Sequence, residues 1–150
     1  MIDAQTQQTF DAFCDLTLPK SDWTHGAHLR VCWAALTTTR DPAATVELLR
    51  QTIRAYNTAT GVENTATSGY HETLTQYFVG AVASLSPTSI LEVVGSSRCS
   101  TQAPLRHWSR TLLFSPKARA TWIEPDETPL PWPPAKALRT SSNQPPREHS

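Results

Sequence analysis

The sequence has no excess of charge of either sign. Thirteen Lys and Arg residues balance thirteen Asp and Glu residues, and charged residues make up only 17% of the 150-residue chain. A general nucleic-acid binder normally carries a basic excess or a basic stripe, and an acidic, disordered protein carries the opposite excess. The chain also has no run of 18 apolar residues, which a transmembrane helix would need. We therefore expect neither a nucleic-acid partner nor a membrane partner.

Cysteine is scarce and is not arranged in pairs. Cys14, Cys32 and Cys99 are odd in number and show no C-x-x-C spacing. The opening residues MIDAQTQQTF lack the basic region and following apolar region of a secretory signal. Free thiols in a reducing compartment are the simplest explanation, so we expect a cytoplasmic protein.

Glycine is also scarce, and proline is concentrated near the end of the sequence. Seven of the twelve prolines fall in the stretch that begins PDETPLPWPP. Such density is incompatible with a helix or a central strand, because each proline fixes φ and removes a hydrogen-bond donor. We predict one helical domain over residues 1–126 and a Pro-rich tail over 127–150, disordered from about residue 140. Trp132 and Leu138 are the expected anchors of the nearer part of the tail.

The rest of the sequence shows the pattern of helices. A capping side chain stands before a residue suited to the first helical position at four places: Ser21-Asp22, Asp41-Pro42, Ser86-Pro87 and Ser115-Pro116. Together with apolar periodicity, these caps predict helices over residues 3–15, 22–38, 42–59 and 70–85, with shorter ones at 87–94, 105–113 and 116–123. We predict an all-α fold: an up-and-down four-helix core followed by short C-terminal helices.

Two histidines begin the second expected helix on its apolar side. At about 100° per residue, His25 and His28 share a face with Leu29 and Cys32. This face should pack inward, so both imidazoles are expected at the N-terminal end of an apolar stripe.

A third histidine occupies a similar place in the fourth expected helix. His71 lies on the same helical face as Leu74 and Phe78. In an up-and-down core with short loops, the second and fourth helices point the same way. Their N-termini, and with them the three histidines, should then converge at one end of the core.

Three converging imidazoles suit either of two kinds of site. The first is a divalent metal held by His25, His28 and His71, with Glu72 as a further ligand or a catalytic base, or with Asp22 as fourth ligand. Zn, Fe, Ni and Mn all accept such ligands, and the sequence does not choose among them. The second is a metal-free pocket for a small anion at the positive ends of two helices. A third reading is an interaction module, in which the histidines are structural and the Pro-rich tail meets a partner.

Other catalytic motifs are absent or incomplete. The string His71-Glu72 begins like H-E-x-x-H, but Thr75 stands where the second histidine is needed. No phosphate-binding glycine loop and no nucleophile elbow occurs. His107 belongs to a small basic cluster, and Arg119 and Asp126 are candidates for a structural salt bridge or for closing the site.

Three motifs resemble a family of small bacterial proteins of unknown function. They are W-T-H-x-x-H-L at residues 23–29, G-Y-H-E-T at 69–73 and L-F-S-P-x-A-R at 113–119. The resemblance covers roughly residues 10–130. It implies that His25, His28, His71 and Glu72 belong to one site, and it names neither a metal nor a substrate. We therefore predict a small cytoplasmic helical protein whose histidine-rich pocket binds a divalent transition metal and would suit a metal-assisted reaction on a small molecule. The alternatives are the metal-free pocket for a small anion and the interaction module.

Overall fold

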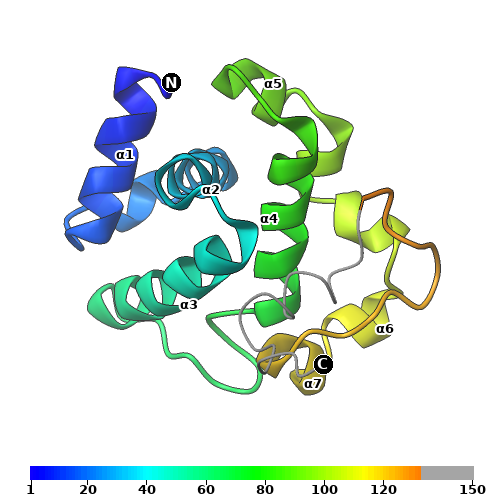
Figure 1. Cartoon of the computed structure of the whole chain (residues 1–150). Coiled ribbons are helices and arrows are strands. Elements are labelled where there is room, and N and C mark those ends of the chain that lie inside the picture. The colour runs from blue at the N-terminus through cyan, green and yellow to red at the C-terminus, as the bar shows by residue number, and fades with distance from the viewer. Residues whose placement is uncertain (133–150) are drawn as a thin grey trace, which may run out of the picture.

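Every regular element in the structure is helical. The computed structural model describes residues 1–132, and this part of the chain contains no strand (Figure 1). The four longest helices are α1 (Ala4–Cys14), α2 (His25–Thr39), α3 (Pro42–Ala59) and α4 (Glu72–Leu85). They pack on one another as the core. The predicted all-α fold is confirmed.

Shorter helical elements follow the core. They are α5 (Ile90–Val94), α6 (Arg110–Leu113) and α7 (Pro116–Ala120), and single 3₁₀ turns cover Lys20–Asp22, Ser97–Cys99 and Ala103–Arg106. Within residues 1–132, no helix has both the length and the apolar character needed to cross a membrane. Leu138 and the segment predicted to be disordered from about residue 140 lie outside the described residues.

Two of the four predicted caps begin helices where expected. The Asp41 carboxylate accepts from the Ala44 N–H at 3.0 Å, and the Ser115 hydroxyl accepts from the Ala118 N–H at 3.2 Å. Each is followed by a proline at the first helical position, where the missing N–H costs nothing.

The other two predicted caps are wrong. Ser21 lies in a 3₁₀ turn, and α2 begins only after Thr24, whose hydroxyl caps it by accepting from the Ala27 N–H. Ser86 ends α4 in the left-handed region with φ 45°, and Ser89 caps α5 instead. A serine before a residue suited to the first helical position is therefore not sufficient, on its own, to locate the start of a helix.

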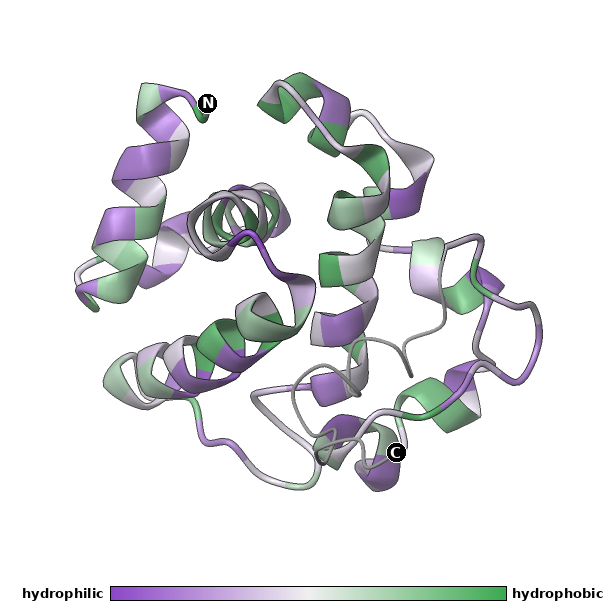
Figure 2. Cartoon of the chain, in the orientation of Figure 1, coloured by the Kyte–Doolittle hydropathy of each residue, from purple (hydrophilic) through white to green (hydrophobic). Residues whose placement is uncertain are grey.

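The core helices cross rather than run side by side. In Figure 1, α2 is seen end-on while α3 and α4 lie across the view. The parallel alignment expected for α2 and α4 is therefore not observed. Figure 2 shows polar segments over much of α1 and apolar segments along α4, the central helix.

Aromatic side chains fill the C-terminal half of the core. Trp108 has 0% exposure, and its indole Nε1–H donates to the Ile123 carbonyl oxygen at 2.9 Å. Its ring meets Tyr77 and Trp122 in edge-to-face contacts, with centroids 5.8 and 5.5 Å apart. These contacts join α4 to the irregular C-terminal segment.

Trp132, which was predicted to anchor the nearer part of the tail, packs onto α4 at Gly80. A Cβ built on Gly80 would lie 2.5 Å from the Trp132 Nε1. The Trp132 ring also lies 5.2 Å from the ring of Tyr77, and the Arg98 guanidinium lies 5.6 Å over it. The Pro-rich segment after residue 126 is thus packed on the body of the protein at Trp132, as expected for the nearer part of the tail.

Candidate functional site

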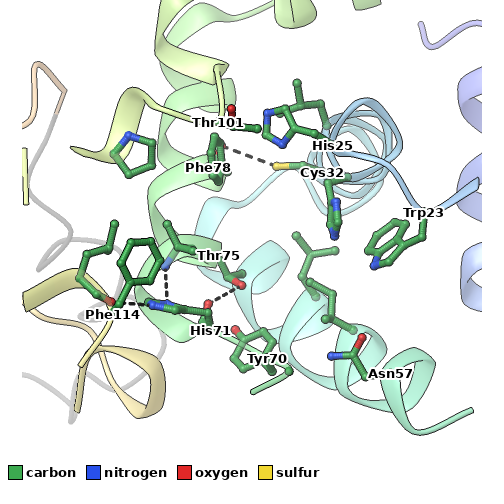
Figure 3. A pocket seen from close by; sticks show the side chains of 18 of the residues that line it. Trp23, His25, Cys32, Asn57, Tyr70, His71, Thr75, Phe78, Thr101 and Phe114 are labelled. Carbon is green, nitrogen blue, oxygen red and sulfur yellow. Dashed lines mark hydrogen bonds between the residues drawn. The ribbon is translucent and has the colours of Figure 1, made fainter. Parts of the chain in front are cut away.

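A cavity of about 590 Å³ opens between α2, α3, α4 and the segment around residues 101–114. Its wall is mostly apolar and aromatic and includes Trp23, Leu29, Leu49, Phe78, Leu105 and Phe114. His25, His28 and His71 also line it, so the structure brings the three histidines to one pocket (Figure 3). All three line the cavity because the starts of α2 and α4 lie on opposite sides of it, and not because the two helices are parallel.

The two histidines of α2 are each held by one hydrogen bond and one aromatic ring. His25 Nε2 lies 2.7 Å from the Cys99 carbonyl oxygen, and its ring meets Phe78 at 5.3 Å in an edge contact. His28 Nδ1 lies 3.0 Å from the Thr24 carbonyl oxygen, and its ring centroid is 3.7 Å from that of Trp23. Each ring is thereby oriented against the wall of the pocket.

His71 has a different role from the one expected. It was predicted inside a helix over residues 70–85, but it precedes α4 and is its N-cap. The ring Nδ1 accepts from the Leu74 N–H at 3.1 Å, and the Nε2–H donates to the Leu113 carbonyl oxygen at 2.8 Å (Figure 3). The imidazole replaces the usual serine or aspartate cap, and both ring nitrogens are used by the fold.

Glu72 is the centre of a buried hydrogen-bond network beside the pocket. Its carboxylate accepts two hydrogen bonds from Arg50, at 2.9 and 2.8 Å, one from the Tyr70 hydroxyl at 2.8 Å and one from the Gln76 amide at 2.7 Å. Burial opposes ionisation of Glu72, but these hydrogen bonds outweigh it and lower the pKa of the carboxyl below its ordinary value. Glu72 does not line the cavity, and its carboxylate is fully engaged.

The donor set predicted for a metal does not fit one in this arrangement. Neither His71 nor Glu72 retains an atom for coordination, and Asp22 lies on an exposed 3₁₀ turn. Within residues 1–132, no group of three or more His, Cys, Asp or Glu side chains is placed to hold a metal ion. His25 and His28 each keep one ring nitrogen without a partner among the described residues, which is fewer ligands than a stable protein site normally uses.

The remaining candidates for the site lie outside the cavity. His107 Nδ1 lies 3.0 Å from the Thr128 carbonyl oxygen, and Asp126 accepts from the Ser109 N–H at 2.7 Å. No ion pair joins Arg119 to Asp126 in the described part of the chain. Arg119 instead donates to the Gly69 carbonyl oxygen at 2.8 Å, and thereby holds the loop that carries His71.

Sequence reasoning missed the loop that shapes one side of the pocket. The Asn64 side-chain oxygen accepts from the Tyr70 N–H and from the Asn57 amide, both at 3.0 Å. Gly69 adopts φ +82°, and a Cβ there would lie 2.5 Å from the Glu63 carbonyl oxygen. The available signal was this glycine in the polar stretch GVENTATSG, since only glycine fits so tight a turn.

Stability is expected to fall as the pH is lowered from about 6.5 to about 4.5. Burial lowers the pKa of His71, and loss of hydration inside the pocket lowers the pKa of His28 to about 4, although His28 is an exposed residue by surface area. Both groups bind a proton less readily when folded than when unfolded, so the stability they contribute is complete above the unfolded pKa near 6.5 and is lost as the pH falls. Protonation of His71 also removes the acceptor that caps α4.

Melting temperatures between pH 7 and 4.5 check this expectation. The lower limit avoids the range in which buried carboxylates such as Glu72 titrate. The matched variant is His71→Asn, which keeps a capping oxygen but has no group that titrates. Its melting temperature should depend less steeply on pH than that of the wild type. An unchanged slope would show that His71 does not contribute.

The wall of the pocket is better suited to binding than to nucleophilic attack. The Cys32 thiol donates to the Phe78 carbonyl oxygen at 3.7 Å, and burial raises its pKa, so it is held in the unreactive thiol form. The Tyr70 hydroxyl is engaged with Glu72, and burial raises its pKa as well. Comparisons with models of protein families, with curated proteins and with solved structures find no match to the chain.

Proposed function

We propose that this protein binds a small, mainly apolar molecule in the histidine-lined pocket. The observation that carries the proposal is the cavity itself: about 590 Å³, with a mostly apolar and aromatic wall and a few polar groups. Small-molecule sites in proteins typically measure about 300–1,000 Å³ and have this mixture of apolar wall and few polar groups. His25 and His28 supply polar atoms that orient the ligand, while His71 shapes the pocket by capping α4.

Two observations favour this function over the other candidates. The engaged nitrogens of His71 and oxygens of Glu72 leave an incomplete donor set for a metal centre. Trp132, the aromatic residue of the tail that a partner would bind, is packed on Gly80 of the same chain.

The three cysteines are free thiols, which supports our proposal that the protein works in the reducing cytoplasm.

The proposal is tested with Nile red, an uncharged apolar dye whose fluorescence rises when it leaves water. Untagged protein should bind it saturably, with one site per chain. Leu74→Trp places a bulky side chain in the cavity and should weaken binding at least tenfold, because the pocket volume is filled. Leu91→Trp is the matched control: Leu91 is 75% exposed on α5, outside the pocket, and its replacement should leave binding unchanged.

Two outcomes would contradict the proposal. Equal loss or equal retention of binding in both variants would place the dye elsewhere on the molecule. Stabilisation of the untagged wild type by added Zn²⁺, Ni²⁺, Mn²⁺ or Fe²⁺, lost in both His25→Ala and His71→Ala, would instead support the metal centre.

A further inference from the structure

The hydrogen bonds of His25 and His28 determine which ring nitrogens carry protons. A backbone carbonyl oxygen only accepts. His25 Nε2, bonded to the Cys99 oxygen, and His28 Nδ1, bonded to the Thr24 oxygen, must therefore be the protonated nitrogens. In the neutral rings, His25 Nδ1 and His28 Nε2 carry lone pairs, and neither accepts a hydrogen bond from another residue in the described part of the chain.

A third acceptor belongs to Asn57. The Asn64 side-chain oxygen already accepts from the Tyr70 N–H, which fixes the orientation of that amide. Asn57 must then present its NH₂ group to the Asn64 oxygen. The side-chain oxygen of Asn57, which lines the cavity, has no donor among residues 1–132.

Several donors of the wall, in contrast, are already used within the protein. The Tyr70 hydroxyl donates to Glu72, the Thr75 hydroxyl to the His71 carbonyl oxygen, and the Cys32 thiol to Phe78. The cation of the wall is Arg110, an exposed side chain whose guanidinium lies 5.7 Å from the Phe114 ring centroid. The pocket therefore presents apolar surface, the acceptors of His25, His28 and Asn57, and the donors of Trp23, Thr101 and Gln102, which bond to no other residue in the described part of the chain.

On the basis of the binding function proposed above, we propose that the ligand is an uncharged, mainly apolar molecule that carries a hydroxyl group, whose O–H donates to His25 or His28. A carboxylate has no proton to donate to these nitrogen lone pairs. An ether of the same shape would leave the acceptors without partners. The lowered pKa of His28, about 4, keeps its ring an acceptor at neutral pH.

Three probes of nearly the same shape test this ligand class: 2-naphthol, 2-methoxynaphthalene and 2-naphthoate. In calorimetric titrations of untagged protein at neutral pH, 2-naphthol should bind about tenfold more tightly than either of the others, as one well-made hydrogen bond provides. His28→Leu removes one acceptor and should weaken 2-naphthol binding several-fold while leaving the methyl ether unaffected. His107→Leu, outside the cavity, is the matched control and should change neither.

A second measurement uses the wild type alone and does not depend on the folding of any variant. In protein labelled with ¹⁵N-histidine, the unprotonated nitrogen of His25 or His28 should shift when 2-naphthol is added and not when the methyl ether is added. Tightest binding of 2-naphthoate, or equal affinities for all three probes, would overturn the assignment of a hydroxyl ligand. Saturable Nile red binding in that case would leave the pocket function intact, whereas its absence would refute the pocket function itself.

Discussion

Glu72→Ala is expected to lower the free energy of unfolding by about 2–4 kcal/mol, because it leaves two buried donors without an acceptor and removes one partner of Arg50, a side chain that is 36% exposed. Glu72 is 5% exposed, and it satisfies donors from Arg50, Tyr70 and Gln76. Its removal leaves Tyr70 and Gln76 without their acceptor, whereas Arg50 keeps its pair with Glu47. Gln76 already has one buried oxygen that lacks a partner among the described residues. Chemical denaturation at neutral pH measures the change.

Glu47 provides the matched control for this prediction. Its carboxylate pairs with the same Arg50, on the same helix, but is 53% exposed. Exposed pairs contribute about 0–1 kcal/mol, so Glu47→Ala should cost no more than that. Equally small costs for both substitutions would show that the contact between Arg50 of α3 and Glu72 of α4 contributes little to stability.

Trp108→Ala should be similarly severe, with a loss of about 3–5 kcal/mol, because a large and fully buried side chain leaves a cavity that its neighbours fill only in part. The substitution also removes the indole donor to the Ile123 carbonyl oxygen and the edge contacts with Tyr77 and Trp122. The denaturation midpoint should fall while the slope of the transition stays constant.

Phe114→Ala is the comparison for Trp108→Ala. Phe114 is 47% exposed at the pocket, so its truncation should cost about 1 kcal/mol or less. A Trp108→Ala protein with wild-type stability would show that the segment from α6 to Trp122 is not part of the folded core.

The starts of helices could be predicted where a capping side chain and the proline after it are enough to determine them. Asp41-Pro42 and Ser115-Pro116 each combine a cap with a proline at the first helical position, and both begin helices. Ser86-Pro87 has the same local pattern, yet Ser86 ends α4 with a positive φ. The difference lies in where the preceding helix stops, and packing against the rest of the chain sets that point.

The site could be predicted only in part, and for a similar reason. The i, i+3 spacing of His25 and His28 correctly placed both rings on one helical side, and both line the pocket. The cap formed by His71 depends on a carbonyl oxygen from Leu113, far along the chain. The engagement of Glu72 depends on Arg50, which lies on a different helix. Periodicity along a single helix carries no information about such long-range partners.

The contact between Trp132 and Gly80 has a consequence for the way the protein is made. Fifty-two residues separate the two positions. Ribosomes add about 5–20 residues per second, so Trp132 is joined to the chain about 3–10 s after Gly80. Throughout that interval the surface of α4 over Gly80 lacks the ring that covers it in the finished fold. During biosynthesis this contact therefore forms only after all four long helices have been synthesised.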